Sequence, residues 1–259
     1  MQYTSTANLM IKSLRALRTK KGRAEQQRFL IEGTRLVGDA LADGVRPEQV
    51  LYDPARPAAV TVAEEARGRG IRVDEASEKV ISALSDTEMP QGVVAVCPYF
   101  ELPYAPQAAP GELILALDGL QDPGNIGTII RTAEAAGVSA IYVSRGAVQK
   151  YNPKLIRATM GAFFRLPMFF DCDLPAVLTQ LHDTGYRVLA SALEGEDFYS
   201  RTPDAAAKAL IIGSEANGVS GEALARADRT YRLPITGRAE SLNAAIAAGI
   251  LIYDLKMRG

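Results

Sequence analysis

The residues with the clearest potential for chemistry lie in three short segments. Asn125 and Arg131 follow the strand-like run LILALDGL and the turn DPG, so an amide and a guanidinium stand beside a glycine-rich loop. Glu215 stands among glycines in LIIGSEANGVS, and Ser241 and Asn243 precede a stretch rich in alanine and glycine. Loops that follow parallel strands and precede helices are where α/β proteins bind ligands. Each segment also has a purely structural interpretation, as a turn, an exposed loop or a capped helix.

Several common catalytic devices are absent from the sequence. The spacing Gly119-x4-Gly124 imitates a phosphate loop, but Asn125 follows where that loop requires lysine, and no G-x-G-x-x-G fingerprint occurs. His182 is the only histidine, it falls on a polar helix face, and no G-x-S-x-G motif is present. We therefore expect neither a nucleotide triphosphatase nor a Ser-His-Asp hydrolase, and a nicotinamide-dependent oxidoreductase has little support.

Composition favours a cytoplasmic globular protein. Of the 259 residues, 47% are hydrophobic and 23% are charged, and Cys97 and Cys172 are the only cysteines. Two isolated thiols predict neither a disulfide framework nor a metal cluster, and they suit a reducing compartment. The longest nearly apolar stretch, 242–253, is shorter than the roughly 18 residues of a membrane span, and the N-terminus lacks the apolar region of a signal peptide. We expect no metal and no membrane contact.

The elements that must position the candidate residues form two groups. The first is a small mixed unit, with helices expected over 8–19, 33–43 and 58–70 and strands over 49–52, 71–73 and 92–96. In the second group, strands expected over 113–117, 140–143, 164–169, 187–191, 209–212 and 230–233 alternate with helices over 126–136, 152–160, 174–184, a short one capped by Ser220, and 241–256. This alternation predicts an α/β fold with a mostly parallel sheet covered on both faces.

A proline-rich stretch separates the two groups. Residues 98, 103, 106 and 110 are all proline, a composition typical of an extended, semi-rigid linker. We therefore predict a first domain over 1–97, a linker over 98–111 and a second domain over 112–259.

The charges of the chain are divided unevenly. Residues 1–35 carry eight basic and two acidic side chains, a local charge of +6, although the whole chain has a net charge of −1. Such asymmetry indicates contact with a polyanion, or alternatively a solvated basic helix face. Residues 151–165 form a second basic stretch. The candidate phosphate contacts are Lys12, Arg15, Arg18, Lys20, Lys21, Arg23 and Arg28, together with Lys154 and Arg157.

Taken together, the motifs resemble those of one enzyme family. DGLQDPGNIGTIIRTAEAAG, YNPKLIRATMGAFFRLP, LIIGSEANGVS and LPITGRAESLNAAIAAGI are similar to the motifs of the SpoU/TrmH family of RNA ribose 2′-O-methyltransferases, within the SPOUT superfamily. The resemblance covers roughly 113–256. The segments NLMIKSLRALRTKKGRAEQQRFLIEG and TEMPQGVVAV resemble the RNA substrate-binding domain attached to many members, especially those that modify ribosomal RNA.

The resemblance implies a fold, a cofactor and a reaction. The fold would be an α/β SPOUT domain whose C-terminal segment threads a trefoil knot, preceded by a small α/β RNA-binding domain. The knot would hold S-adenosyl-L-methionine largely through backbone groups, the protein would be a homodimer, and the product would be a 2′-O-methylated RNA, with 23S ribosomal RNA the expected substrate. The residues implied to bind the cofactor are Gly213, Leu233 and Leu242, with Ile212 and Ile235 beside them.

Arg131 matches the arginine that the family uses in catalysis. A guanidinium releases its proton only above about pH 12, so we interpret Arg131 as a bidentate clamp on the phosphate beside the target ribose rather than as a general base. The resemblance implies that Asn125, Glu215, Ser241 and Asn243 form the rest of the catalytic pocket. Two alternatives remain at this point: an RNA-binding or ribosome assembly factor that lacks activity, and a methyltransferase that acts on tRNA.

Overall fold

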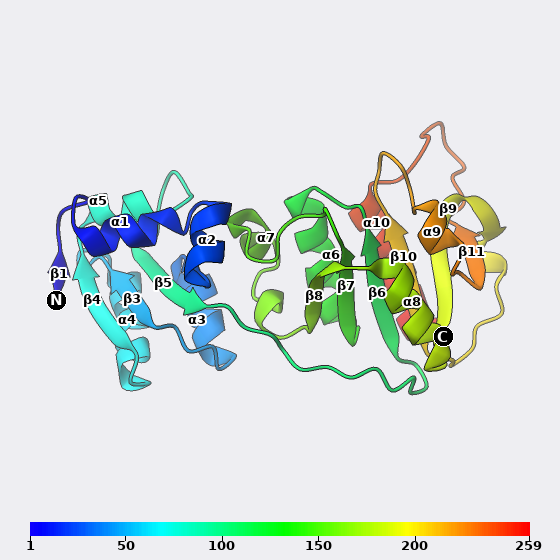
Figure 1. Cartoon of the computed structure of the whole chain (residues 1–259), viewed down its shortest axis with the longest axis horizontal. Helices are drawn as coiled ribbons and strands as arrows, with labels where there is room; N and C mark the ends of the chain where they lie inside the picture. Colours follow the sequence, from blue (N-terminus) through cyan, green and yellow to red (C-terminus); the bar gives the residue numbers. More distant parts are fainter. The chain divides into compact units, whose positions relative to one another are not determined.

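The computed structural model describes residues 1–259, which divide into two compact units (Figure 1). Unit 1 comprises Met1–Phe100 and Tyr151–Phe164, and unit 2 comprises Glu101–Lys150 and Arg165–Gly259. The predicted second domain included residues 151–164, whereas their contacts group them with unit 1. The chain therefore passes between the units three times, rather than once through the proline-rich stretch.

Unit 1 is built on a mixed five-stranded sheet with the order β1-β4-β3-β5-β2. Strands β1, β4 and β3 run parallel to one another, and β5 is antiparallel to both β3 and β2. The elements of this unit are β1 (Gln2–Tyr3), α1 (Leu9–Ala16), α2 (Lys20–Gln26), β2 (Arg28–Glu32), α3 (Thr34–Ala42), β3 (Gln49–Tyr52), α4 (Pro57–Gly68), β4 (Arg72–Ala76), α5 (Glu78–Leu84), β5 (Val93–Pro98), α7 (Pro153–Ala158) and the 3₁₀ turn η1 (Ala162–Phe164).

An aromatic cluster joins the 151–164 segment to the rest of unit 1. The ring of Tyr151 stacks on that of Tyr99 with centroids 3.8 Å apart, and Phe163 meets the buried ring of Phe29 edge-on. The Tyr151 hydroxyl accepts from the Phe100 N–H at 2.8 Å and donates to the Phe100 carbonyl at 2.7 Å. Burial of several aromatic rings is a large favourable contribution to stability, so this segment is an integral part of unit 1.

Unit 2 is built on a six-stranded sheet with the order β11-β9-β10-β6-β7-β8, in which all paired strands are parallel. The predicted α/β fold with a mostly parallel sheet is thereby confirmed. Its elements are β6 (Leu113–Asp118), α6 (Pro123–Ala135), β7 (Ala140–Ser144), β8 (Met168–Cys172), α8 (Leu174–Asp183), β9 (Arg187–Asp197), the 3₁₀ turn η2 (Phe198–Ser200), β10 (Lys208–Gly213), α9 (Gly221–Leu224), β11 (Arg229–Arg232) and α10 (Ala244–Arg258).

Both faces of the parallel sheet are buried, as the apolar strand sequences require. On one face, Ile114 and Ile211 pack in the same cluster as Leu178 of helix α8. The alternate residues of the strands, such as Leu115, point to the opposite face, where α10 packs against α6 and contacts β10 (Figure 1). The carboxyl ends of β6 and β10 lie side by side, with Gly213 opposite Asp118.

The proline-rich stretch is fixed to unit 2 from residue 101 onward. The Tyr104 hydroxyl donates to Glu112, the Gln107 N–H donates to the Tyr186 hydroxyl at 3.2 Å, and the Gly111 N–H donates to the Ala205 carbonyl at 2.8 Å. Residues 99–111 contain no helix or strand, as the prolines predict, but these contacts hold residues 101–111 along unit 2.

Two sequence-based expectations about elements are wrong. The strand expected over 164–169 begins only at Met168, because Pro167 lacks an N–H for the ladder and η1 occupies 162–164. The last helix is capped by Asn243, not by Ser241, since the Asn243 Oδ1 accepts from the N–H groups of Ala245 and Ile246. Leu242 therefore precedes this helix instead of starting it. Strands β1 and β2 and helices α2 and α5 were not predicted.

Candidate active site

The loop after β6 places Asn125 inside the first turn of α6. Gly119 has φ +67°, a conformation that suits glycine, and its N–H donates to the Ser144 Oγ at 2.8 Å. Asp122 caps the helix by accepting from the Asn125 N–H at 2.7 Å, and Pro123 occupies the first helical position, where no N–H is needed. Because Asp122 is the cap, the side chain of Asn125 is free to bind elsewhere.

Asn125 connects the three candidate segments. Its Nδ2 donates to the Glu215 carboxylate, and its Oδ1 accepts from the Asn243 Nδ2 at 3.1 Å. Residues that are 90 and 118 positions apart in sequence are thus joined through one amide. These two hydrogen bonds bring the three segments together at the carboxyl end of the parallel sheet. Glu215 Oε2 meets no protein donor.

A tight loop carries Glu215. Ser214 and Gly218 exchange two backbone hydrogen bonds of 3.1 and 2.8 Å, and the Ser220 N–H donates to the Asp118 Oδ2 at 2.8 Å. A Cβ at Gly213 would lie 2.1 Å from the Gly218 carbonyl carbon, so only glycine fits there. Asp118 anchors this loop to the end of β6. Sequence reasoning missed Asp118; its place at the end of a buried strand was the available signal.

Arg131 projects from α6 into solvent. Its guanidinium makes no ion pair or hydrogen bond with the protein, unlike Arg165, which is 2.7 Å from Glu134, and Arg187, which is paired with Asp204. It lies roughly 9 Å along the helix axis from Asn125, so Asn125 does not hold it. All five N–H donors of Arg131 are therefore available to a bound ligand.

The segment between β11 and α10 has an unpaired backbone. No N–H or C=O group of residues 234–242 makes a hydrogen bond within the protein. Leu233 and Ile235 are half-buried, and Ser241 and Leu242 are exposed. Such a segment fits a cofactor held by backbone groups, because its donors and acceptors have no partner in the protein. The side chain of Ile212 is buried within the sheet, and no hydrogen bond joins Leu233 or Ile235 to the Asn125 network.

The candidate phosphate contacts of unit 1 divide into exposed and structural residues. Arg23 is a wrong prediction: it is buried, and its Nη1 donates to the carbonyls of Leu17 and Arg18 at 3.1 Å, which secures the end of α1. Arg157 forms ion pairs with Glu32 at 3.0 Å and Asp86 at 2.8 Å. Arg28 pairs with Glu48, and Arg18 reaches the Ala83 carbonyl. The fully exposed candidates are Lys12, Arg15, Lys20, Lys21 and Lys154.

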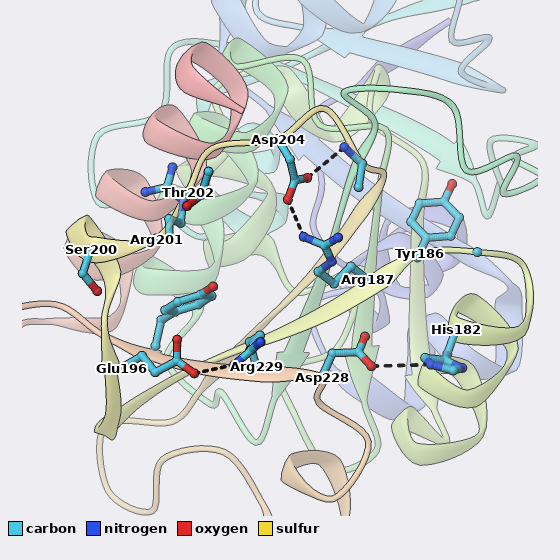
Figure 2. Close-up of a pocket in the computed structure, with 13 residues that line it drawn as sticks. His182, Tyr186, Arg187, Glu196, Ser200, Arg201, Thr202, Asp204, Asp228 and Arg229 are labelled. Carbon is cyan, nitrogen blue, oxygen red and sulfur yellow. Dashed lines mark hydrogen bonds and ion pairs between the residues drawn. The ribbon is translucent and has the colours of Figure 1, made fainter.

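A cavity of unit 2 lies away from these residues. It has a volume of about 730 Å³, and none of the candidate catalytic or cofactor residues lines it. Figure 2 shows contacts among its side chains: ion pairs of Arg187 with Asp204 and of Arg229 with Glu196, and a contact between His182 and Asp228. It includes Tyr186 and Arg187 at the amino end of β9. Gly213 lies at the carboxyl end of the neighbouring parallel strand β10, on the opposite side of the sheet along the strand direction.

Neither cysteine is suited to nucleophilic chemistry. Burial raises the pKa of the Cys97 thiol far above its usual range and also raises that of Cys172. The described side chains contain no group of three His, Cys, Asp or Glu that would hold a metal ion. None of the helices has the length and hydropathy of a membrane span.

Comparison with known proteins decides the family. Residues 112–253 match the model of the SpoU rRNA Methylase family, and residues 8–95 match the MRM3-like substrate binding domain. The chain belongs to the SpoU rRNA methylase family. It is an RNA 2′-O-methyltransferase that uses S-adenosyl-L-methionine.

Relatives of this SpoU methylase are similar along its whole length. It is 37% identical over 257 residues to 23S rRNA (guanosine(2553)-2′-O)-methyltransferase RlmP of Bacillus subtilis, covering 98% of this chain and 99% of that protein. It superimposes on an AdoMet-bound rRNA methyltransferase from Sinorhizobium meliloti with a TM-score of 0.87 and 36% identity, covering 99% and 97% of the two chains. The AdoMet complex of AviRb from Streptomyces viridochromogenes gives a TM-score of 0.81 at 27% identity, covering 96% and 97%.

Proposed function

We propose that this protein methylates a ribose 2′-hydroxyl of 23S ribosomal RNA, in the cytoplasm. The observation that carries the proposal is the hydrogen-bonded contact of Asn125, Glu215 and Asn243 at the carboxyl end of the sheet. Asn125 lies on α6, the helix that also carries the unpaired Arg131. The relative RlmP, whose name specifies a 2′-O position in 23S rRNA, spans nearly the same length.

In this mechanism the side chains bind and orient the RNA. Arg131 holds the phosphate beside the target ribose through two parallel N–H donors, which fixes the direction of the 2′-hydroxyl. The Asn125 amide, held from both sides by Glu215 and Asn243, keeps the walls of the pocket in place. Glu215 Oε2 is the carboxylate oxygen free to take up the hydroxyl proton as the new bond forms. S-adenosyl-L-methionine supplies the methyl group from a sulfonium centre.

The cofactor would be held by the backbone of two segments. One is the end of β10 at Ile212 and Gly213, and the other begins at Leu233 and continues through the unpaired stretch 234–242, which contains Ile235 and Leu242. Ser241 lies near its end and is exposed. We also propose that this stretch forms the trefoil knot expected of the family.

We further propose that the enzyme is a homodimer through α10. Ile246, Tyr253 and Met257 are 55%, 44% and 67% exposed, and their spacing of seven and four residues places them on one helix face. A stripe of large apolar side chains on a helix indicates an interface. Ile246→Glu is expected to yield a monomer in light scattering; a dimer that persists in this variant would contradict the assignment.

Mapping of ribose methylation in total RNA tests the proposed substrate. RNA from cells with and without the gene is compared by resistance of each 2′-position to alkaline cleavage. The proposal predicts that one 23S rRNA position loses protection in the absence of the gene and regains it when the gene is restored. Loss confined to a tRNA would overturn the 23S assignment and support the alternative substrate.

A further inference from the structure

A second concave site lies in unit 1, apart from the residues assigned to methyl transfer. Its volume is about 270 Å³, and its walls come from the end of β2, the start of α3, the loop before β5 and the residue two positions after α7. Leu36, Met89 and Met160 provide its apolar surface. Small pockets with apolar walls and a few polar groups are typical of small planar ligands.

Two methionines line the site and reach solvent. Met89 is 89% exposed, although large apolar side chains are usually buried, and Met160 is 37% exposed. The φ of +50° at Met160 belongs to the residue after the C-cap of α7, where helices commonly end in left-handed backbone. Methionine sulfur makes favourable contacts with aromatic rings, so the pair is suited to flank a planar heterocycle.

The polar groups of the site suit the edge of a base rather than a phosphate. Gln91 Oε1 accepts from the Thr34 N–H at 2.9 Å and hydroxyl at 3.0 Å, which fixes the amide and leaves the Nε2 donors without a protein acceptor. The charges are balanced, because Arg157 pairs with Glu32 at 3.0 Å and Arg35 faces Asp39 at 3.9 Å. A phosphate would have to displace these carboxylates, whereas an uncharged base would not.

The site adjoins the basic helix α1. A smaller depression shares Glu32, Leu36 and Arg157 with it and is completed by Leu17 and Arg18 beside the end of α1. Folded RNA is recognised in sequence through unstacked bases, while cationic side chains hold the adjacent phosphates. We propose that this cavity receives one unstacked base of the RNA substrate, so that unit 1 recognises sequence as well as charge. The inference rests on the proposed function, because the ligand it names is part of that RNA.

Methyl NMR of the full-length protein tests the assignment. The chain has six methionines, so labelling of their ε-methyl groups gives few signals, and Met89→Ala and Met160→Ala identify the two of interest. The four ribonucleoside 5′-monophosphates are titrated separately, with inorganic phosphate as a control. We expect saturable shifts of the Met89 and Met160 signals with at least one nucleotide, at a dissociation constant of about 1 mM or below, and none with phosphate. Unmoved Met89 and Met160 signals with all four nucleotides would overturn the proposal, as would equal shifts with phosphate.

A variant that leaves the fold intact provides the second arm. Met89→Ala changes an exposed side chain and is expected to weaken nucleotide binding about two- to tenfold, the range of a sulfur–aromatic contact. Leu193→Ala, at another exposed apolar residue, is the matched control and should leave binding unchanged. Unchanged nucleotide affinity of Met89→Ala would remove Met89 from the site. Methyl transfer is measured on the same samples: activity without nucleotide shifts refutes this inference alone, and nucleotide shifts without activity refute the proposed function alone.

Discussion

At the level of single residues, the proposed mechanism depends on polar side-chain atoms that have no hydrogen-bond partner in the protein and can therefore bind RNA. The guanidinium of Arg131 and the Oε2 atom of Glu215 have no partner in the protein. The side-chain amide of Asn125, in contrast, is fixed by hydrogen bonds to two partners. The structure therefore separates side-chain atoms that hold one another from side-chain atoms that are free to bind a ligand.

Arg131→Lys tests the clamp. Lysine retains the charge but presents no planar pair of donors, so methylation should fall by about 10²–10³-fold while S-adenosyl-L-methionine binding, measured by calorimetry, stays unchanged. Arg187→Lys, at the opposite edge of the sheet, is the control and should keep its activity. Normal turnover of Arg131→Lys at saturating RNA would eliminate the clamp.

Glu215→Gln tests the proton acceptor. Glutamine retains an oxygen that accepts from Asn125 and so preserves the network, but it cannot take a proton from the 2′-hydroxyl. The maximal rate should fall by about 10²–10⁴-fold, with little change in the RNA concentration at half-maximal rate. If the rate is retained, Glu215 only positions Asn125.

The residues of this pocket could be inferred from sequence because each stands at a strand end or helix start. Their partners could not: that Asp122 caps α6 and Asn243 caps α10 depends on the actual path of each turn. Arg23 resembles its basic neighbours in sequence, and only the position of the α1 carbonyls shows that it is structural.

At the element scale, the close approach of β10 and the loop 214–218 positions the site. Gly213→Ala would place a Cβ 2.1 Å from the Gly218 carbonyl carbon, so the loop must move. The strain should cost about 1–3 kcal/mol and lower the melting temperature by about 2–4 °C for each kcal/mol, with weaker cofactor binding in calorimetry.

Gly221→Ala is the matched control for that substitution, because an added Cβ there meets nothing within 4 Å. It should leave both the melting temperature and cofactor affinity nearly unchanged. Equal behaviour of the two alanine variants would show that the Gly213 contact does not shape the site.

At the scale of the whole molecule, the two units are less separable than the linker composition predicted. The aromatic contacts of Tyr151 and Phe163 with residues near 29 and 99 are long-range, and periodicity contains no information about them. Removal of residues 1–111 would expose those rings, so the contribution of unit 1 to RNA binding has to be measured in the full chain.

A salt series makes that measurement. Replacement of Lys12, Arg15, Lys20 and Lys21 by glutamine removes four exposed cations without loss of any buried contact. If all four contact phosphate, the slope of log affinity against log salt concentration should decrease by roughly three, at about 0.7–0.9 for each contact. A double variant, Arg56→Gln with Arg67→Gln, serves as the control. An unchanged slope in the quadruple variant would mean that this helix face is only solvated.

The chemical identity of the product decides whether this protein methylates a ribose of 23S rRNA. The purified full-length protein is incubated with S-adenosyl-L-methionine labelled in its methyl group and with ribosomal RNA from cells that lack the gene, both as free RNA and as precursor particles. The RNA is then digested to nucleosides. The account predicts that label appears in a single 2′-O-methylribonucleoside derived from 23S rRNA and disappears with Arg131→Lys. Label in a base, or no label in ribosomal RNA from an enzyme that binds the cofactor, would contradict it.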